Sequence, residues 1–220
     1  GGAIVIGVDG NRIIGNFLLD TVGNVDESNG CGNDKTPCMH HPSYGMGIGA
    51  NNNFRDNVIE GNTVANNVHQ GIRLNAFINT TVRNNVVYNN KNQIVIEDKK
   101  GPSHSNVVEG NIIYPLHPDQ IGLSLTSDTN HGSFDNNYYC NPYSEVMVIR
   151  NKKRYSLGQW QSAFAPQDQH SQSCEWLGFE QYQVSKVEAD LILNSTFDTD
   201  VADWGDSGAA VISHDASKAE

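Results

Sequence analysis

The sequence has little positive charge. Lys and Arg together number 14 against 25 Asp and Glu, which gives a formal net charge of −11. A nucleic-acid-binding surface needs a basic excess to meet the phosphates, so this balance disfavours DNA or RNA as a partner. Any other anionic ligand would need a local basic patch or bridging cations. The chain also lacks an apolar run of about 18 residues, so we expect no membrane-spanning helix.

Cysteine is scarce, and its spacing does not favour zinc. The four cysteines form no CxxC pair and no Cys/His spacing typical of zinc sites. Cys31 and Cys38 bracket one short loop, and Cys140 and Cys174 bracket the segment after the last repeat. We predict two disulfides with these pairings, each contributing about 2–4 kcal/mol, with metal binding as the alternative. Disulfides indicate an oxidising compartment, and the many Asn, Ser, Thr and Gly residues also suit an extracellular or cell-surface protein.

What the sequence does contain is a repeat of about 22 residues. One column holds asparagine, and apolar or β-branched residues recur three residues before it, two residues after it and about ten residues later. The four columns are Asn16, Asn62, Asn84 and Asn111; Ile13, Ile59, Thr81 and Val108; Leu18, Val64, Val86 and Ile113; and Ile48, Ile72, Ile94 and Ile121. Self-similarity at a fixed period indicates a solenoid. Because Gly and Asn separate short β-branched runs, we predict a β-helix rather than a helical array.

One coil can be followed from residue 57 to residue 74. Strands are expected at Val58–Glu60, Thr63–Ala65 and Gly71–Leu74, with Ile72 pointing inward. Gly61–Asn62 forms a turn, because both residues tolerate positive φ. Stacked coils lie about 4.8 Å apart, so the asparagines of successive turns can hydrogen-bond as a ladder. We therefore assign these asparagines to turn chemistry rather than to ligand binding.

This pattern, over about residues 1–140, resembles the right-handed parallel β-helix proteins of the pectate-lyase-like superfamily. The resemblance implies an all-β solenoid, and the superfamily includes polysaccharide lyases, glycoside hydrolases, uronan epimerases, phage tailspikes and adhesins. We expect a secreted polysaccharide-processing protein, a lyase or glycoside hydrolase acting on an acidic glycan in a cleft along the β-helix. The alternative is a non-catalytic glycan-binding adhesin or surface solenoid, because a fold alone does not fix a function.

We divide the chain into three regions. Residues 1–139 form the coils, and further N-terminal coils are expected to be missing because residues 1–7 already resemble a strand within a solenoid. Residues 140–185 form a cap with a short amphipathic helix that begins near Ser156. This segment is similar to the one that closes many secreted β-helix proteins, so we assign its Asp168 and His170 to capping rather than to catalysis.

The third region, residues 186–220, changes character again. Its segment 191–204 resembles the first strand of extracellular carbohydrate-binding β-sandwich modules, and too few residues follow to close a sandwich. The resemblance implies that Asp198 can help to hold a structural calcium, with an ordinary acidic turn as the alternative. No other cofactor is required by the sequence, and further domains of the same chain are expected.

A candidate site lies where the third strand of each coil faces outward. The outward positions are Gly49, Arg73, Val95 and Gly122, and we expect Arg73 to be solvent-accessible because Gly49 leaves room above it. His69 precedes this strand. Three inserted loops overhang the same face and carry His40, His41 and Tyr44; Lys99, Lys100 and His104; and Asp128.

Two mechanisms fit these residues. In β-elimination, Arg73 neutralises the uronate carboxylate, and the remaining groups move protons to and from the sugar: Lys99, His41 or His69, and Tyr44. In hydrolysis, two carboxylates flank the scissile bond at a separation of about 5–9.5 Å, and the candidates are Glu97, Asp98 and Asp128. Alternatively, each histidine is an ordinary exposed loop residue, and Lys99 and Lys100 belong to a solvated turn.

Overall fold

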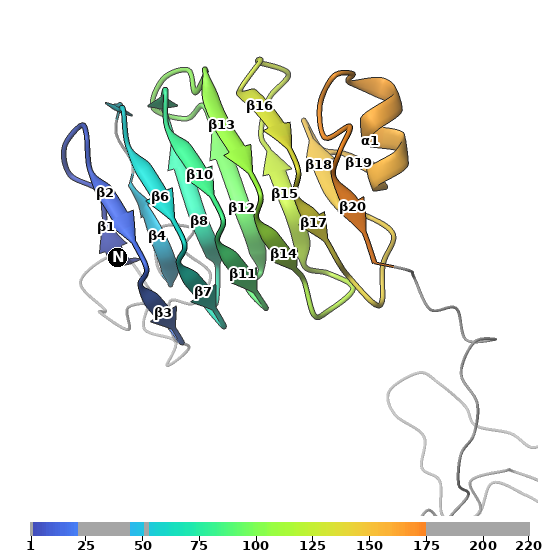
Figure 1. The fold of residues 1–220 in the computed structure, drawn as a ribbon, viewed down its shortest axis with the longest axis horizontal. Helices are drawn as coiled ribbons and strands as arrows, with labels where there is room; N and C mark the ends of the chain where they lie inside the picture. The colour runs from blue at the N-terminus through green and yellow to red at the C-terminus, as the bar shows by residue number, and fades with distance from the viewer. Residues whose placement is uncertain (1, 22–44, 51–52, 175–220) are drawn as a thin grey trace, which may run out of the picture. The chain divides into compact units, whose positions relative to one another are not determined.

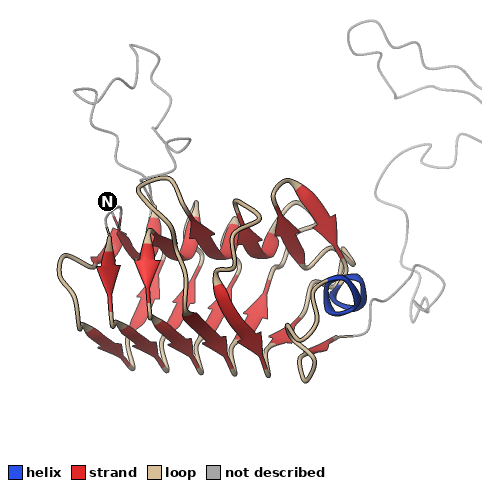
Figure 2. Cartoon of the chain, turned by 90° about the horizontal axis from the view of Figure 1, so that it is seen from above, coloured by secondary structure: helices blue, strands red, loops and turns tan. Residues whose placement is uncertain are grey.

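The computed structural model describes residues 2–21, 45–50 and 53–174. They form a parallel β-helix with three long sheets along its sides (Figures 1 and 2). The predicted all-β solenoid is therefore confirmed. No helix in the described ranges is long and apolar enough to cross a membrane.

Each sheet takes one strand from each successive coil. Sheet A contains β1 (Gly2–Val5), β4 (Met46–Ala50), β8 (Gln70–Asn75), β12 (Asn92–Glu97), β15 (Ile121–Leu125), β18 (Val148–Arg150) and β19 (Lys153–Tyr155). Sheet B contains β2 (Arg12–Ile14), β6 (Val58–Glu60), β10 (Thr81–Arg83), β13 (Asn106–Glu109) and β16 (Gly132–Asp135). Sheet C contains β3 (Phe17–Leu19), β7 (Thr63–Ala65), β11 (Val86–Tyr88), β14 (Ile112–Tyr114), β17 (Tyr138–Tyr139) and β20 (Gln172–Ser173). A small fourth sheet pairs β5 (Phe54–Arg55) with β9 (Phe77–Ile78).

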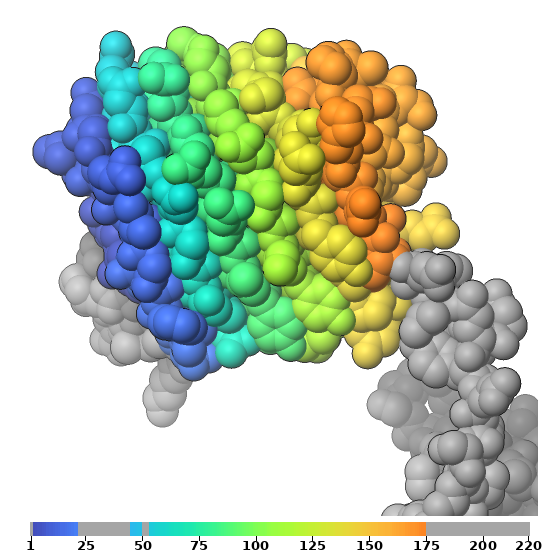
Figure 3. All heavy atoms as spheres, in the orientation of Figure 1, coloured from blue at the N-terminus to red at the C-terminus, as the bar shows by residue number. Residues whose placement is uncertain are grey.

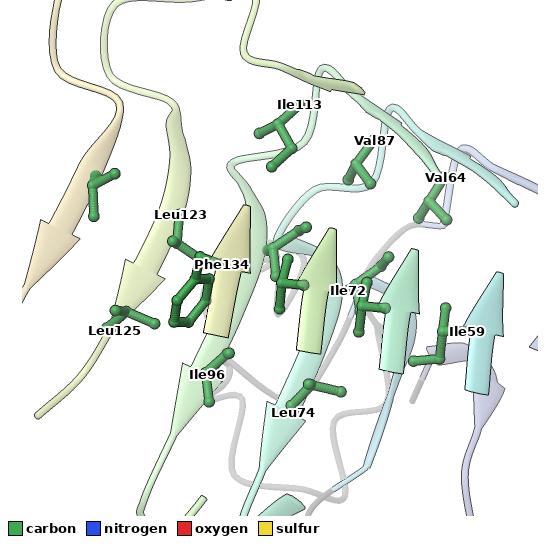
Figure 4. Packing of buried hydrophobic residues seen from close by; sticks show 14 of the residues in the cluster. Ile59, Val64, Ile72, Leu74, Val87, Ile96, Ile113, Leu123, Leu125 and Phe134 are labelled. Carbon is green, nitrogen blue, oxygen red and sulfur yellow. The ribbon is translucent and has the colours of Figure 1, made fainter. Parts of the chain in front are cut away.

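The interior is a stack of apolar side chains from all three sheets, and strands of sheet A such as β8, β12 and β15 contribute two each (Figure 4). On sheet B the stacked residues are Ile13, Ile59, Val82, Val108 and Phe134. Those on sheet C include Val64, Val87 and Ile113, and those on sheet A include Ile72, Ile94 and Leu123. All members of these columns are at least nine-tenths buried. Because the columns are continuous, the coils share one core.

The third coil shows a shift of one residue from the predicted columns. Val82 and Val87 point inward, where Thr81 and Val86 were predicted. The reason is the pair of asparagines that follows β10. Asn84 adopts φ 55°, the same left-handed turn position that Gly61 holds at φ 62° in the preceding coil. Asn85, rather than Asn84, therefore occupies the ladder.

The fourth column is also corrected at its last member. Ile48, Ile72 and Ile94 are register partners as predicted, but the next residue in the stack is Leu123. Ile121 is buried and pairs with Asn92 instead. Ile121 and Leu123 are two residues apart, so both point to the same face of a strand. Alternation alone could not show which of them is the register partner of Ile94.

The predicted asparagine ladder runs between sheets B and C. Each rung donates through both its backbone N–H and its Nδ2 to the Oδ1 of the next, at 2.9–3.0 Å, through Asn16, Asn62, Asn85, Asn111 and Asn137. The last four side chains are almost completely buried. A buried amide must find partners for its N–H and C=O groups, and here the neighbouring coil supplies them.

The C-terminal end of the ladder is closed by Asp168. Asn137 donates from Nδ2 to Asp168 Oδ1 at 3.1 Å and from its backbone N–H to Ser171 Oγ at 2.8 Å. Trp160, on helix α1 (Leu157–Ala163), donates to Asp168 Oδ2 at 2.8 Å. His170 instead contacts Asp135, 2.7 Å away, so it does not form a pair with Asp168.

The cap has a locally capped helix and a covalent link to the end of the coils. Ser156 is the N-cap of α1, as the sequence indicated, and the structure adds a capping box with Gln159. The predicted disulfide between Cys140 and Cys174 is present, with the two Cα atoms 4.9 Å apart. Cys31 and Cys38 lie outside the described residues, so their pairing stays a prediction.

Candidate functional site

Arg73 lies on β8, on the outer face of sheet A, between Gly49 and Val95 of the adjacent strands. The prediction that it is solvent-accessible is wrong, because the residue is only 3% exposed. Gly49 does leave room, but Arg73 itself fills it: a Cβ at position 49 would lie 2.9 Å from the Arg73 carbonyl oxygen and 3.1 Å from its Cβ. Alternation along a strand gives the direction of a side chain and not its exposure.

The partner of Arg73 is Glu97, at the end of β12. Arg73 donates to Glu97 Oε2 from Nε at 3.0 Å and from Nη2 at 2.5 Å. The other oxygen, Oε1, accepts from Lys99 Nζ at 3.1 Å. Glu97 is 4% exposed, whereas the Lys99 side chain is 56% exposed. The three residues therefore form one charge cluster, with a buried carboxylate between two cations.

A second cluster lies at the next corner, after β12 and β15. Asp98 accepts from the Ser103 backbone N–H at 2.7 Å and from the Ser127 hydroxyl, and His131 Nε2 lies 3.4 Å from its Oδ2. Burial alone would raise the pKa of Asp98, but the hydrogen bonds from Ser127 and Ser103 outweigh it and hold the pKa below its usual value. Burial lowers the pKa of His131, and the charge of Asp98 offsets only part of this effect.

Sequence reasoning did not identify this second cluster as a unit. Asp98 was named as a candidate carboxylate, and His131 ends the loop that was expected to overhang the site. Their proximity depends on the stacking of two coils, since they are far apart in the sequence. The sequence did contain one indication of this proximity, because the loops that carry Asp98 and His131 both follow strands of the same sheet.

The other candidate residues are not brought to Glu97. Asp128 is exposed, accepts from Asn151 Nδ2 at 2.6 Å and lies beside Arg150. His69 is buried just before β8, where its backbone N–H donates to the Gly45 carbonyl at 3.2 Å. At the outward position beside Val95 the structure places Ser124, where Gly122 was predicted. A Cβ on Gly122 would instead meet Ile113 and Tyr139 in the core.

Several candidates lie outside the described residues: His40, His41, Tyr44 and Asp198. The roles assigned to the first three, and the calcium site at Asp198, stay predictions. Of the two other loop residues, Lys100 is exposed and His104 contacts Ser105 at 3.0 Å.

The arrangement of Glu97 limits its chemistry. A general acid or base must reach the sugar, but the Glu97 carboxylate is 4% exposed and its two oxygens are bonded to Arg73 and Lys99. Lys99 Nζ is itself engaged by the Glu97 carboxylate. The cluster is therefore suited to holding charge in place.

A comparison with protein-family models gives the family. The model described as periplasmic copper-binding protein (NosD) matches residues 38–163, just over half of the chain. The chain belongs to the NosD family. This is a parallel β-helix family, in agreement with the structure, and membership supports an extracellular or periplasmic location. No curated protein and no solved structure matched the chain.

The copper named in the NosD family description was tested against the described residues. They contain no group of three or more His, Cys, Asp and Glu side chains that could hold a metal ion. Cys140 and Cys174 are joined to each other, and Met46 Sδ lies 3.9 Å from the Arg73 guanidinium, a cation. The described coils therefore do not fit a copper site.

Proposed function

We propose that this NosD-family chain is an exported β-helix that binds an anionic polysaccharide along one edge of sheet A. The proposed surface, called here the basic edge, contains Lys99 and Lys100 after β12, Lys152 in the turn after β18, and Lys153 at the start of β19, which pairs with Arg150. All four residues are exposed. Parallel strands place their C-terminal ends on the same edge of a sheet, and β12, β15 and β18 are consecutive strands (Figure 1).

Charge supports this proposal. On a chain with a formal charge of −11, an anionic polymer can approach only where basic side chains gather. Acidic groups near the basic edge already have partners: Glu97 has Arg73 and Lys99, and Asp128 has Asn151 and the nearby Arg150. These acidic groups therefore cancel less of the positive charge of the basic edge than a simple count of acids would suggest.

Binding is favoured here over cleavage. The observation that carries this choice is that both carboxylate oxygens of Glu97 are bonded to cations. A retaining or inverting glycosidase needs a carboxyl group within reach of the scissile bond, whereas Glu97 is only 4% exposed. The alternative is a lyase or a hydrolase, which would draw on Asp98 and Asp128 or on residues outside the described ranges.

The test measures binding and cleavage in the same samples. Isothermal titration with a polyuronate should show binding that weakens as salt is added, and a neutral dextran should show none. The double variant Lys99→Ala/Lys100→Ala should weaken binding several-fold, and so should Lys152→Ala/Lys153→Ala. The matched control is Lys91→Ala, an exposed lysine at the opposite end of β12.

Four results would count against the proposal. An absence of polyuronate binding would reject it, as would an equal loss with Lys91→Ala. Release of an unsaturated, absorbing product would instead identify a lyase, and new reducing ends without that absorbance would identify a hydrolase.

A further inference from the structure

The loop after β15, the end of β18 and the cap line a cavity of about 340 Å³. Its walls include Thr129, Asn130 and His131 from the loop, Arg150 from β18 and Phe164 from the cap. Figure 3 shows the cap, drawn in orange, packed against the last coil, drawn in yellow. Pockets for small molecules have volumes of about 300–1,000 Å³, so this cavity is suited to a ligand of about one ring.

His131 has one ring nitrogen without a hydrogen-bond partner in this cavity wall. The residue is 2% exposed, and its Nε2 lies 3.4 Å from Asp98 Oδ2. Because a carboxylate only accepts, Nε2 carries the proton and Nδ1 of the neutral ring is an acceptor. Nδ1 is buried without a partner. Burial lowers the pKa of His131, and the Thr129 backbone, one of the groups that oppose this effect, does not complete a hydrogen bond to Nδ1. A buried acceptor of this kind calls for a donor from outside the chain.

Arg150 adds an unused donor to the same cavity. Its Nη2 donates to the Asp128 carbonyl at 2.6 Å, but its Nε is buried and forms no hydrogen bond. The Asp128 carboxylate lies 3.7 Å from Nε and is 72% exposed to solvent, so it neutralises the guanidinium only in part. The guanidinium lies 4.4 Å from the centroid of the Phe164 ring, which holds it in place beside the cavity. A carboxylate is the natural partner for an arginine donor of this kind.

We infer that the cavity holds one uronate residue of a bound polysaccharide, with its carboxylate on Arg150 Nε and a ring hydroxyl donating to His131 Nδ1. This inference rests on the function proposed above and names the sugar unit that gives it specificity. The two unused atoms select this ligand together. A simple carboxylate has no donor for Nδ1, and a neutral sugar has no charge for Arg150, whereas a uronate carries both groups.

The cavity adjoins the basic edge on two sides. Asp98, which contacts His131, directly precedes Lys99 in the chain. Arg150 is the register partner of Lys153 in the β18–β19 hairpin. A polyuronate bound along the basic edge can therefore place one of its residues in the cavity while its other carboxylates meet the lysines.

The experiment measures the binding of trigalacturonate and of its methyl ester to the 220-residue chain by NMR. Trigalacturonate should cause saturable shifts in the backbone amides of the cavity wall, at Asn130, His131 and Gln167. The methyl ester has the same shape without the charge, so it should bind at least tenfold more weakly. Arg150→Gln removes the cation, and this variant should bind the acid and the ester with nearly equal affinity.

Two adjacent positions on α1 give a matched pair of variants. Ala163 and Ser162 are both exposed, but only Ala163 lines the cavity. Ala163→Phe fills part of the cavity and should weaken trigalacturonate binding at least tenfold, whereas Ser162→Phe should leave it unchanged. Urea unfolding curves that match wild type show that both variants are folded. The loss of preference for the acid in Arg150→Gln is an independent check, because a general loss of structure would not remove that preference alone.

Three outcomes overturn the inference. In the first, trigalacturonate causes no saturable shift in the cavity wall, as expected if the cavity holds only water. In the second, Ala163→Phe and Ser162→Phe have equal effects, and in the third, the ester binds wild type as tightly as the acid. If the polyuronate still binds through the basic-edge lysines while Ala163→Phe has no effect, the proposed function stands and this inference alone fails. If wild type binds neither the polyuronate nor trigalacturonate, both fail.

Discussion

Two carboxylates are buried in the part of the chain that the structure describes, and they are stabilised by opposite means. Asp168, at the end of the asparagine ladder, is completely buried and accepts from Asn137, Trp160 and Ser171, all neutral donors. Glu97, on the outer face of sheet A, is 4% exposed and lies between the cations Arg73 and Lys99.

The difference reflects the groups that each carboxylate has to satisfy. The ladder ends with N–H groups, and a carboxylate offers only acceptors, so Asp168 completes it as another asparagine could not. Burial raises the pKa of Asp168, although the hydrogen bonds from Ser171 and Asn137 oppose the shift. Glu97 instead balances an arginine that the packing of sheet A has buried. Neither carboxylate needs a catalytic role to account for its burial.

The largest expected effect comes from removing the ladder's last acceptor. Asp168→Ala leaves the buried donors of Asn137, Trp160 and Ser171 without their partner, at about 1–3 kcal/mol each. We expect a loss of about 5 kcal/mol in the free energy of unfolding, measured in urea. Asp168→Asn keeps one acceptor oxygen and should lose clearly less. Equal losses in the two variants would show that acceptor capacity is not what matters.

Breaking the ion pair should have the next largest effect. Arg73→Met leaves Glu97 buried with only Lys99 as a cation, and such a deletion costs about 3–5 kcal/mol. Replacing both residues, Arg73→Met with Glu97→Leu, removes the buried charge as well and should recover most of that loss. Urea unfolding of the two variants checks the order. A double variant as unstable as the single one would mean that packing, not charge, dominates.

A smaller effect is expected from the pH dependence of the free energy of unfolding. The contribution of Asp168 to this dependence has the opposite sign to that of Asp98 and Asp135. Because its folded-state pKa is raised, the folded protein holds this proton more tightly than the unfolded chain does. The contribution of Asp168 to stability should therefore fall as pH rises from the ordinary carboxyl pKa through the folded-state value. Asp98 and Asp135, whose pKa values are lowered, act in the opposite direction. The free energy of unfolding is measured against pH for wild type and for Asp168→Asn, and the difference between the two curves isolates the contribution of Asp168. A difference that rises with pH would contradict the prediction.

The smallest effect on stability is expected at Lys99. Its side chain is 56% exposed, and Arg73 still balances Glu97 when it is removed. Lys99→Ala should change the free energy of unfolding by about 0–1 kcal/mol. It should nevertheless reduce polyuronate affinity, because Lys99 belongs to the basic edge. A large stability loss without any change in affinity would place Lys99 in the structural ion cluster alone.

The fold could be predicted from the residue types in the sequence and their period. Gly and Asn at turns, β-branched residues between them and a regular period require short strands that stack, and Ile13, Ile59 and Val108 occupy the predicted core column. The N-cap at Ser156 and the Cys140–Cys174 disulfide were also readable, because each depends on residue type within or beside one segment.

Only the stacked coils decided the rest. Asn84 and Asn85 are the same residue type, and the hydrogen bonds of the neighbouring coils select Asn85 for the ladder. Alternation placed Arg73 on the outer face, but its burial depends on Gly49 one strand away and on Glu97 in the next coil. Direction follows from the backbone of a single strand, whereas exposure, pairing and charge balance are set by neighbours that the chain brings together only when it folds.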